Sequence, residues 1–246
     1  MRLFYHLGRY YILLSKIFGR PERYRMYYRQ TMRELEFQGI NSIGIVVIIS
    51  IFVGAVITIQ TNYNIESPLL PRYLIGVGVR DMLLLEFSST MIALILAGKV
   101  GSSISSELGT MRITEQIDAL EIMGVNSASF LILPKLIATM FFFPLLAILS
   151  LIVGMGGGYL TCLITNVATP QEFVDGLQYV FYPYYFTYAL KKMVVFAFLI
   201  TTISAYHGYY AQGSSLEVGK SSTRAVVHSS IFILMFNLIL TKLILG

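Results

Sequence analysis

Five long apolar segments constrain the fold of this chain more than any other feature of its sequence. They run approximately over residues 40–60, 77–100, 136–164, 186–206 and 225–245. Each has at least the roughly 20 residues that a helix needs to cross the hydrocarbon core of a bilayer. Only 13% of the residues are charged, whereas soluble domains carry about a quarter. The sequence therefore predicts an all-α integral membrane protein with about five transmembrane helices.

The distribution of Lys and Arg predicts which side of the membrane each end of the chain occupies. Eight of these residues precede the first apolar segment: Arg2, Arg9, Lys16, Arg20, Arg23, Arg25, Arg29 and Arg33. The same side receives Lys99, Arg112, Lys135, Lys220 and Arg224, and the opposite side receives Arg72 and little else. Cytoplasmic segments are enriched in Lys and Arg, which predicts a cytoplasmic N-terminus and an outside C-terminus. The formal net charge of +5 therefore suits an anionic membrane surface, and no nucleic acid is expected as a partner.

The N-terminal region has the pattern of an amphipathic helix. Its apolar residues recur at helical spacing, and four basic residues fall on the opposite arc. The apolar set is Leu3, Phe4, Leu7, Tyr10, Tyr11, Leu14, Ile17 and Phe18, and the basic set is Arg2, Arg9, Lys16 and Arg20. Such a helix lies in the membrane interface or packs on a partner protein, and no cleavable signal is expected. We therefore divide the chain into an N-terminal interfacial region, 1–38, and a transmembrane domain, 39–246.

The sequence carries no convincing catalytic or metal-binding motif. Residues 213–221 resemble a phosphate-binding loop, but Ser214 stands where that loop requires its first glycine. The three histidines show no ligand spacing, and the lone cysteine, Cys162, falls inside an apolar segment, which is typical of packing. We therefore expect a protein that is not an enzyme and has no cofactor or metal of its own. If it moves a substrate uphill, the energy comes from a partner or an ion gradient.

Several charged residues fall inside the apolar segments. The second carries Arg80, Asp81 and Glu86 in its first half, and the fourth carries Lys191 and Lys192. A charge at the centre of a transmembrane helix costs about 2.5–3.5 kcal/mol on insertion scales, so such residues usually face a cavity or a partner. One interpretation is that Glu86 lines a substrate path near Lys192. The other is a structural ion pair or a position at the interface, where Lys191 or Lys192 reaches the headgroups.

The segment 105–130, between the second and third apolar segments, has an amphipathic helical pattern. Ile113, Ile117 and Leu120 share one face, and Thr114, Asp118 and Glu121 share another. Thr114 is expected to cap this helix, with Glu115 in its first turn. A short cytoplasmic helix joined to two transmembrane helices can transmit force from a soluble motor. The alternative interpretation is a solvated connector.

The same stretch resembles the signature of MlaE-type permeases, the membrane subunits of ABC transporters that serve MCE-domain lipid carriers. The family pattern is approximately A-G-R-x-G-x-x-x-x-x-E-L-G-x-M-x-x-x-E-Q-I-D-A-L-x-x-M-G-V. Residues 97–125 match all of its specified positions except that Lys99 replaces Arg. Further matches are Phe52, Gly54, Gln60, Glu86, Lys192, Val218, Gly219, Thr223, Arg224, Ala225 and Val226. Around Glu86 the chain departs from the family's R-E-L-G-P element, because Leu85, Ser88 and Ser89 replace its arginine, glycine and proline.

The resemblance implies an N-terminal interfacial helix and about five transmembrane helices in a homodimer. It implies cytoplasmic ATPase subunits that bind ATP and dock on the 105–130 segment through Glu107, Met111, Arg112, Glu115, Gln116, Asp118 and Glu121. It matches Glu86 and Lys192 to charged positions of the family, and we predict that these two residues and the neighbouring Lys191 lie near the lipid pathway. It also implies a bacterial inner-membrane location and a periplasmic MCE-domain partner. The activity would be phospholipid transport between inner and outer membranes, which maintains outer-membrane lipid asymmetry.

Two other classes of function stay open at this point. An ion-coupled secondary transporter would use Glu86, Lys191 and Lys192 as a relay, although no inverted repeat is evident in the sequence. A non-transporting membrane scaffold would hold soluble partners through its basic N-terminus and its central segment.

Overall fold

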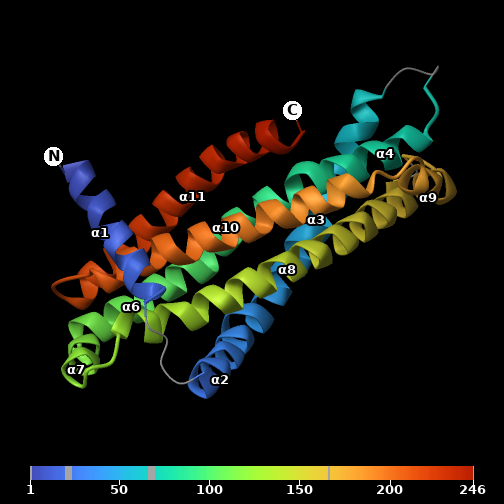
Figure 1. The fold of residues 1–246 in the computed structure, drawn as a ribbon. Coiled ribbons are helices and arrows are strands. Elements are labelled where there is room, and N and C mark those ends of the chain that lie inside the picture. The colour runs from blue at the N-terminus through green and yellow to red at the C-terminus, as the bar shows by residue number, and fades with distance from the viewer. Residues whose placement is uncertain (1, 20–23, 66–69, 166, 246) are drawn as a thin grey trace. The chain divides into compact units, whose positions relative to one another are not determined.

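The computed structural model describes residues 2–19, 24–65, 70–165 and 167–245, and every regular element among them is helical (Figure 1). The first elements are α1 (Arg2–Ile17), α2 (Tyr24–Glu34), η1 (Leu35–Ile40), α3 (Asn41–Asn64), α4 (Tyr73–Met82), η2 (Leu83–Met91) and α5 (Ile92–Leu96). They are followed by η3 (Ala97–Gly101), α6 (Ser102–Ile113), α7 (Gln116–Ile122), α8 (Ser127–Thr165), α9 (Pro170–Gln178), α10 (Pro183–Tyr209) and α11 (Ser215–Leu245). The elements named η are π-helical. Arg20, Arg23 and the side chains of Arg2, Leu3 and Arg25 lie outside the described residues.

Five continuous helices in the described residues are long and apolar enough to cross a membrane. They are Met26–Asn64, Tyr73–Ile113, Ser127–Thr165, Pro183–Tyr209 and Ser215–Leu245. Each contains one of the apolar segments identified in the sequence, which confirms the prediction of an all-α membrane protein with about five transmembrane helices. The first two are longer than their apolar segments because α2 and η1 continue into α3, and α6 continues the helix that begins at Tyr73.

The helices divide into two compact units. One comprises residues 1–41, 93–142 and 194–245, and the other comprises residues 42–92 and 143–193. We call the first the α7 unit and the second the Glu86 unit, after the functional elements that each contains. The long helices α8 and α10 contribute a part to both units.

Small residues bring the helices of the Glu86 unit close together. A Cβ atom on Gly54 of α3 would lie 1.9 Å from the carbonyl oxygen of Gly154 in α8, and one on Gly157 would lie 2.3 Å from that of Ile51. Next to this crossing, the Ser50 hydroxyl donates to Ser150 over 2.8 Å. Small residues and interhelical hydrogen bonds are how membrane helices pack tightly. The glycine-rich run 154–158 therefore serves helix packing.

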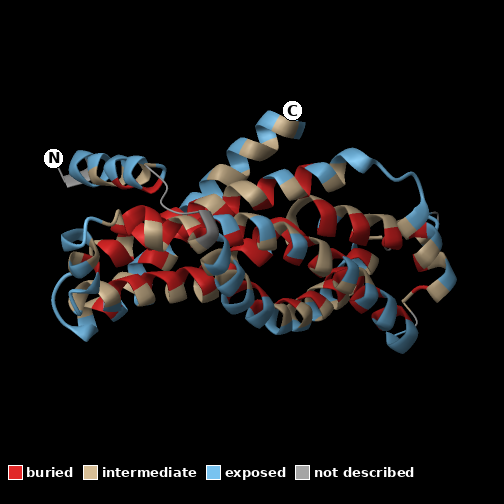
Figure 2. Cartoon of the chain, turned by 60° about the horizontal axis from the view of Figure 1, so that its bottom comes forward, coloured by how far each residue is buried: buried red, intermediate tan, exposed pale blue. Residues whose placement is uncertain are grey.

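The N-terminal helix α1 packs on α10 in the α7 unit. Leu13 and Ile17 are buried, the Tyr10 hydroxyl lies 2.8 Å from Thr202 Oγ1, and His6 Nδ1 lies 2.7 Å from the Tyr206 hydroxyl. Other apolar residues of the helix are exposed, among them Phe4, Leu7, Tyr11 and Phe18. In Figure 2 the N-terminal helix is accordingly pale blue along most of its length. The apolar residues are thus divided between a packed side and an exposed side that suits a membrane interface.

Candidate functional site

Two groups of polar residues stand out in this apolar molecule, and the first is an ion pair in the Glu86 unit. Glu86 lies on η2 and Lys192 lies on α10, and Lys192 Nζ is 3.2 Å from Glu86 Oε1. The Lys192 side chain is 0% exposed, whereas the Glu86 side chain is 42% exposed. The pair therefore consists of a hidden cation and a carboxylate that reaches the surface of its unit.

Further contacts stabilise both members of the pair. The ammonium group of Lys192 also donates to the Leu85 carbonyl over 3.1 Å, and it lies 4.7 Å from the centre of the Tyr188 ring. The Thr90 hydroxyl donates to Glu86 Oε2 over 2.9 Å. A buried ammonium group needs such compensation because its hydration is lost. The short π-helical stretch η2 supplies both the carboxylate and the carbonyl, and π-helical turns are frequent at functional sites.

Lys191 is not part of this pair. Its side chain is exposed, although it directly precedes the buried Lys192 on α10. Consecutive residues of a helix point in directions about 100° apart. The Lys191 and Lys192 side chains therefore lie in different environments, one exposed and one buried. Of the three charged residues predicted near the lipid pathway, the structure brings together Glu86 and Lys192 and leaves Lys191 on the exterior of the Glu86 unit.

Arg80 is a buried charge whose role the sequence did not indicate. Its guanidinium group donates to the carbonyls of Leu177, over 3.1 Å, and Tyr179, over 2.5 Å, and also to Asp81 over 2.9 Å. The two carbonyls belong to the C-terminal end of α9 and the residue after it, where helical carbonyls lack partners. Arg80 therefore caps α9 from α4. The only sequence signal was a cation inside an apolar segment, which does not identify a partner.

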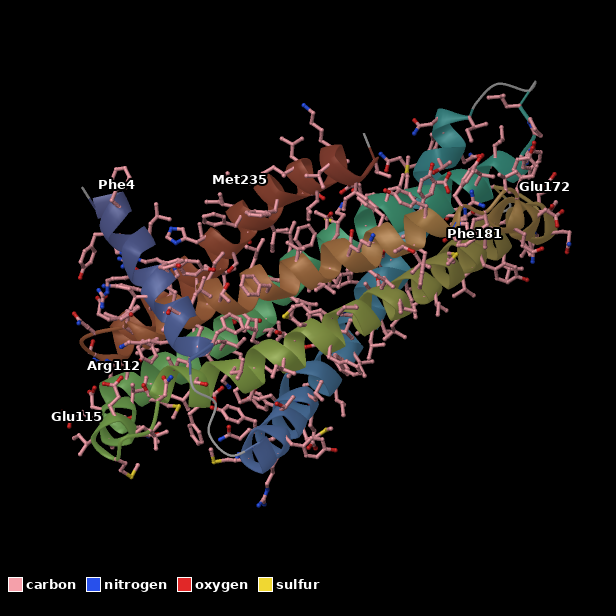
Figure 3. The ribbon with its side chains drawn as sticks, viewed as in Figure 1. Phe4, Arg112, Glu115, Glu172, Phe181 and Met235 are labelled. Atoms are coloured by element: carbon pink, nitrogen blue, oxygen red, sulfur yellow. The ribbon has the colours of Figure 1, made fainter. Side chains whose placement is uncertain are left out.

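The second group surrounds α7 in the α7 unit. Arg112 Nη1 lies 2.6 Å from Asp118 Oδ1 and closes the turn between α6 and α7. Glu121 accepts hydrogen bonds from the hydroxyls of Tyr209 on α10 and Ser127 on α8, each over 2.9 Å. The bond from Tyr209 is the main reason why the pKa of Glu121 is lowered. Three helices thus fix this short element in place. Figure 3 shows Arg112 and Glu115 at the α6–α7 turn.

The start of α7 differs from the prediction that Thr114 caps it. Thr114 instead ends α6, and its hydroxyl donates back to the Thr110 carbonyl over 2.8 Å. Glu115 precedes α7 with a φ of 60°, in the left-handed region, and its side chain makes no capping hydrogen bond. This left-handed residue breaks the helix, so the faces expected for one continuous helix belong to two separate helices. Ile113 lies on α6, whereas Ile117 and Leu120 lie on α7.

Glu107 lies on α6, outside α7, and its partly exposed carboxylate belongs to a charge cluster around a buried lysine. Lys135 Nζ on α8 lies 2.7 Å from Glu107 Oε2 on α6 and 2.6 Å from Glu34 Oε1 on α2. The Lys135 side chain is only 2% exposed. Sequence reasoning counted Lys135 only as a charge near the membrane surface, and it did not single out Glu34.

Much of α7 and its flanks is exposed, including Thr114, Ala119 and Glu121. Glu115 and Gln116 are exposed at its start, Ile122 is 87% exposed and Met123 is 68% exposed at its end. Met111 is half-buried on α6. Isolated exposed apolar residues are common on protein surfaces. Ile122 and Met123 are instead adjacent at the end of a short helix that hydrogen bonds hold in place, so together they form a small exposed apolar surface that a partner protein can bind.

Comparison with known proteins gives a consistent assignment. The family model described as permease MlaE matches residues 31–243. The chain is 33% identical over 243 residues to a probable ABC transporter permease protein of Rickettsia bellii, covering 99% of this chain and 93% of that protein. It is 29% identical over 237 residues to the intermembrane phospholipid transport system permease protein MlaE of Haemophilus influenzae, covering 96% and 90%. These relatives are named as permease components of transport systems, not as enzymes. This chain belongs to the MlaE permease family.

Proposed function

We propose that this protein is the permease subunit of an ATP-driven ABC transporter that moves phospholipid, with ATP bound by separate ATPase subunits. The observation that carries the proposal is the attachment of α7 to α6, α8 and α10 through Asp118 and Glu121, which leaves its tip exposed. A short helix held in this way moves together with the long helices that it joins. A permease whose ATP is bound by separate subunits needs such a connection to its motor.

The ATPase contact falls on the exposed residues of this segment. Glu115 and Gln116 offer polar groups, and Ile122 and Met123 offer an apolar knob that a groove on the ATPase would bury. Glu107, Asp118 and Glu121 act differently in this proposal. Their carboxylates bond to Lys135, Arg112 and Tyr209, so they stiffen the segment and transmit displacement.

The lipid path is assigned to the Glu86–Lys192 pair. An ion pair inside an apolar helix bundle is costly unless it contacts polar groups or water. The half-exposed Glu86 carboxylate provides a polar contact for a headgroup that crosses an otherwise apolar region. The buried Lys192 holds that carboxylate in position through their contact.

The family and the charge distribution support a proposal for the partners and the location. The relative from Haemophilus influenzae is named for an intermembrane phospholipid transport system. The proposal therefore places this chain in a bacterial inner membrane with a cytoplasmic N-terminus, as a homodimer with a periplasmic MCE-domain protein. Its activity would serve the lipid asymmetry of the outer membrane. Two facing copies would provide a space of lipid size between them.

The competing functions have less support. A relay of Glu86, Lys191 and Lys192 would require the three groups to form a chain, but the Lys191 side chain is exposed, whereas Lys192 is buried and bonds to Glu86. A scaffold without transport would not need an ion pair between two transmembrane helices in which the cation is completely buried.

The test is to purify the tagged protein from its native membranes and to identify bound subunits by native mass spectrometry. We expect two copies of the chain with an ATPase, and ATP hydrolysis only when the ATPase is present. The double variant Ile122→Asp/Met123→Asp should lose the ATPase and stay inserted. The matched control Leu70→Asp, an exposed apolar residue of the Glu86 unit, should retain it. Transport activity of the isolated chain, without ATP, would contradict the proposal.

A further inference from the structure

The backbone holds the turn between α7 and α8 in one conformation. Gly124 lies just after α7 and has a φ of 79°, in the left-handed region. Its amide donates to the Glu121 carbonyl over 3.0 Å, and the Val125 amide donates to the Leu120 carbonyl over 3.0 Å. These two bonds form a Schellman motif, which closes the end of a helix. Only Val125 separates Gly124 from Asn126, so this motif fixes the position of Asn126 relative to α7.

The side chain of Asn126 joins two further helices. Its Oδ1 atom accepts a hydrogen bond from the Ser129 amide over 3.3 Å, which caps the first turn of α8. Its Nδ2 atom donates to the Lys16 carbonyl over 2.9 Å, in the last turn of α1. The contact is close, because a Cβ atom on Gly19 would lie 3.2 Å from Asn126 Nδ2. One side chain thus connects the end of α1 to the start of α8 (Figure 1).

A charge contact supports the same connection between α7 and α1. The pKa of Glu121 is lowered mainly by its bond from Tyr209, and the positive charge of Lys16 on α1 lowers it further. Ser127, the neighbour of Asn126, donates to Glu121 over 2.9 Å. Ser127 therefore ties α7 to the start of α8, and Asn126 ties the start of α8 to α1.

The other polar contacts of α1 lie nearer its N-terminus. His6 and Tyr10 bond to α10, and the guanidinium group of Arg9 lies 3.9 Å from the centre of the Tyr210 ring. Lys16 is six residues beyond Tyr10, which is about 9 Å along a helix. A displacement of Lys16 would therefore tilt α1 about its contacts with α10.

We propose that Asn126 is a positioning residue that transmits movement of α7 to the N-terminal helix α1. When the ATPase displaces α7, the Schellman motif carries Asn126 with it, and the bond to the Lys16 carbonyl moves the end of α1. The exposed apolar side of α1 then shifts within the membrane interface. This inference rests on the proposed function, since it needs an ATPase that displaces α7.

The first test is the variant Asn126→Asp, which separates the two bonds of this side chain. Aspartate caps a helix start as well as asparagine does, so the first turn of α8 should be retained. Aspartate has no N–H donor, and its charge would repel the carbonyl end of α1. Hydrogen exchange of residues 10–19 in the purified protein should become about fivefold faster, as the loss of one hydrogen bond would give, while exchange of residues 127–132 stays unchanged. Equal exchange of residues 10–19 in variant and wild type would overturn the proposal.

The second test measures movement of α1 in the complex with the ATPase, reconstituted in lipid nanodiscs. Tyr11 lies on the exposed side of α1, and Tyr11→Cys in a Cys162→Ala background carries an environment-sensitive fluorophore there. We expect its emission to differ between the ATP-free and the vanadate-trapped complex, and Asn126→Asp to remove most of this difference. The matched control is Asn64→Asp, the same substitution at an exposed residue of the Glu86 unit, which should keep it. An undiminished difference in Asn126→Asp would overturn the proposal.

The outcomes separate this inference from the proposed function. ATP-driven phospholipid transport without any change in the emission from α1 would refute the link and leave the transporter assignment intact. A chain that binds no ATPase would overturn both. Native mass spectrometry of the Asn126→Asp complex should still show the ATPase, because Asn126 lies outside the exposed tip of α7. Loss of the ATPase from this variant would place Asn126 in the docking surface and overturn its positioning role.

Discussion

Removing either member of the Glu86–Lys192 pair should have unequal effects on stability. In Glu86→Gln the buried ammonium group of Lys192 loses its carboxylate but keeps the Leu85 carbonyl and the face of Tyr188. In Lys192→Met the half-exposed Glu86 keeps its bond from Thr90 and its access to solvent or headgroups. An uncompensated charge is worse where it is buried, so Glu86→Gln should be the more destabilising change.

The magnitude follows from the burial of the two side chains. Breaking a fully buried ion pair costs roughly 3–5 kcal/mol. Because Glu86 is 42% exposed and Lys192 keeps other contacts, we expect about 2 kcal/mol for Glu86→Gln and about 1 kcal/mol for Lys192→Met. The double variant should be less destabilised than the sum of the two, by about 1 kcal/mol, since the two residues are in contact.

The assay is reversible unfolding of the purified protein in mixed micelles of dodecyl maltoside and sodium dodecyl sulfate. Wild type, the two single variants and the double variant form a thermodynamic cycle. The matched control is Lys191→Met, which changes the exposed neighbour of Lys192 and should shift the unfolding free energy by less than about 0.5 kcal/mol. A larger loss in Lys192→Met than in Glu86→Gln, or additive single changes, would refute this account of the pair.

Three further predictions concern helix packing, the fixation of α7 and topology. Gly157→Ala would place a Cβ atom 2.3 Å from the Ile51 carbonyl oxygen and should lower the unfolding free energy by about 1–3 kcal/mol, whereas Gly156→Ala, with nothing within 4 Å, should be near neutral in the same assay. The lowered pKa of Glu121 means that its stabilisation is present above the ordinary carboxyl pKa of 4.5 and is lost as the pH falls through the lowered value. Hydrogen exchange of α7, corrected for intrinsic rates, should therefore increase on acidification in wild type and depend less on pH in Glu121→Gln; identical pH profiles would contradict this. A cysteine at Gln116, in a Cys162→Ala background, should react with impermeant maleimide only from the cytoplasmic side, and labelling from outside would place α7 beyond the reach of any ATPase.

The sequence alone was sufficient for the fold class and the family, for physical reasons. A bilayer requires long apolar helices, so the five membrane-spanning segments can be read from composition and length. The stretch 97–125 is long enough to identify the family, and the match over residues 31–243 agrees.

The tertiary structure alone decided how the charged residues pair. Hydropathy gives the cost of a charge in a membrane, but the partner is set by which helix faces meet, and Glu86 and Lys192 are 106 residues apart. The same reason applies to Lys135 of α8, which pairs with Glu34 of α2 and Glu107 of α6. The predicted cap at Thr114 was wrong because the left-handed backbone of Glu115 ends one helix before the next begins. The helical spacing of side chains in this segment does not reveal the turn at Glu115. The contacts that α7 makes with α6, α8 and α10 hold the turn in place.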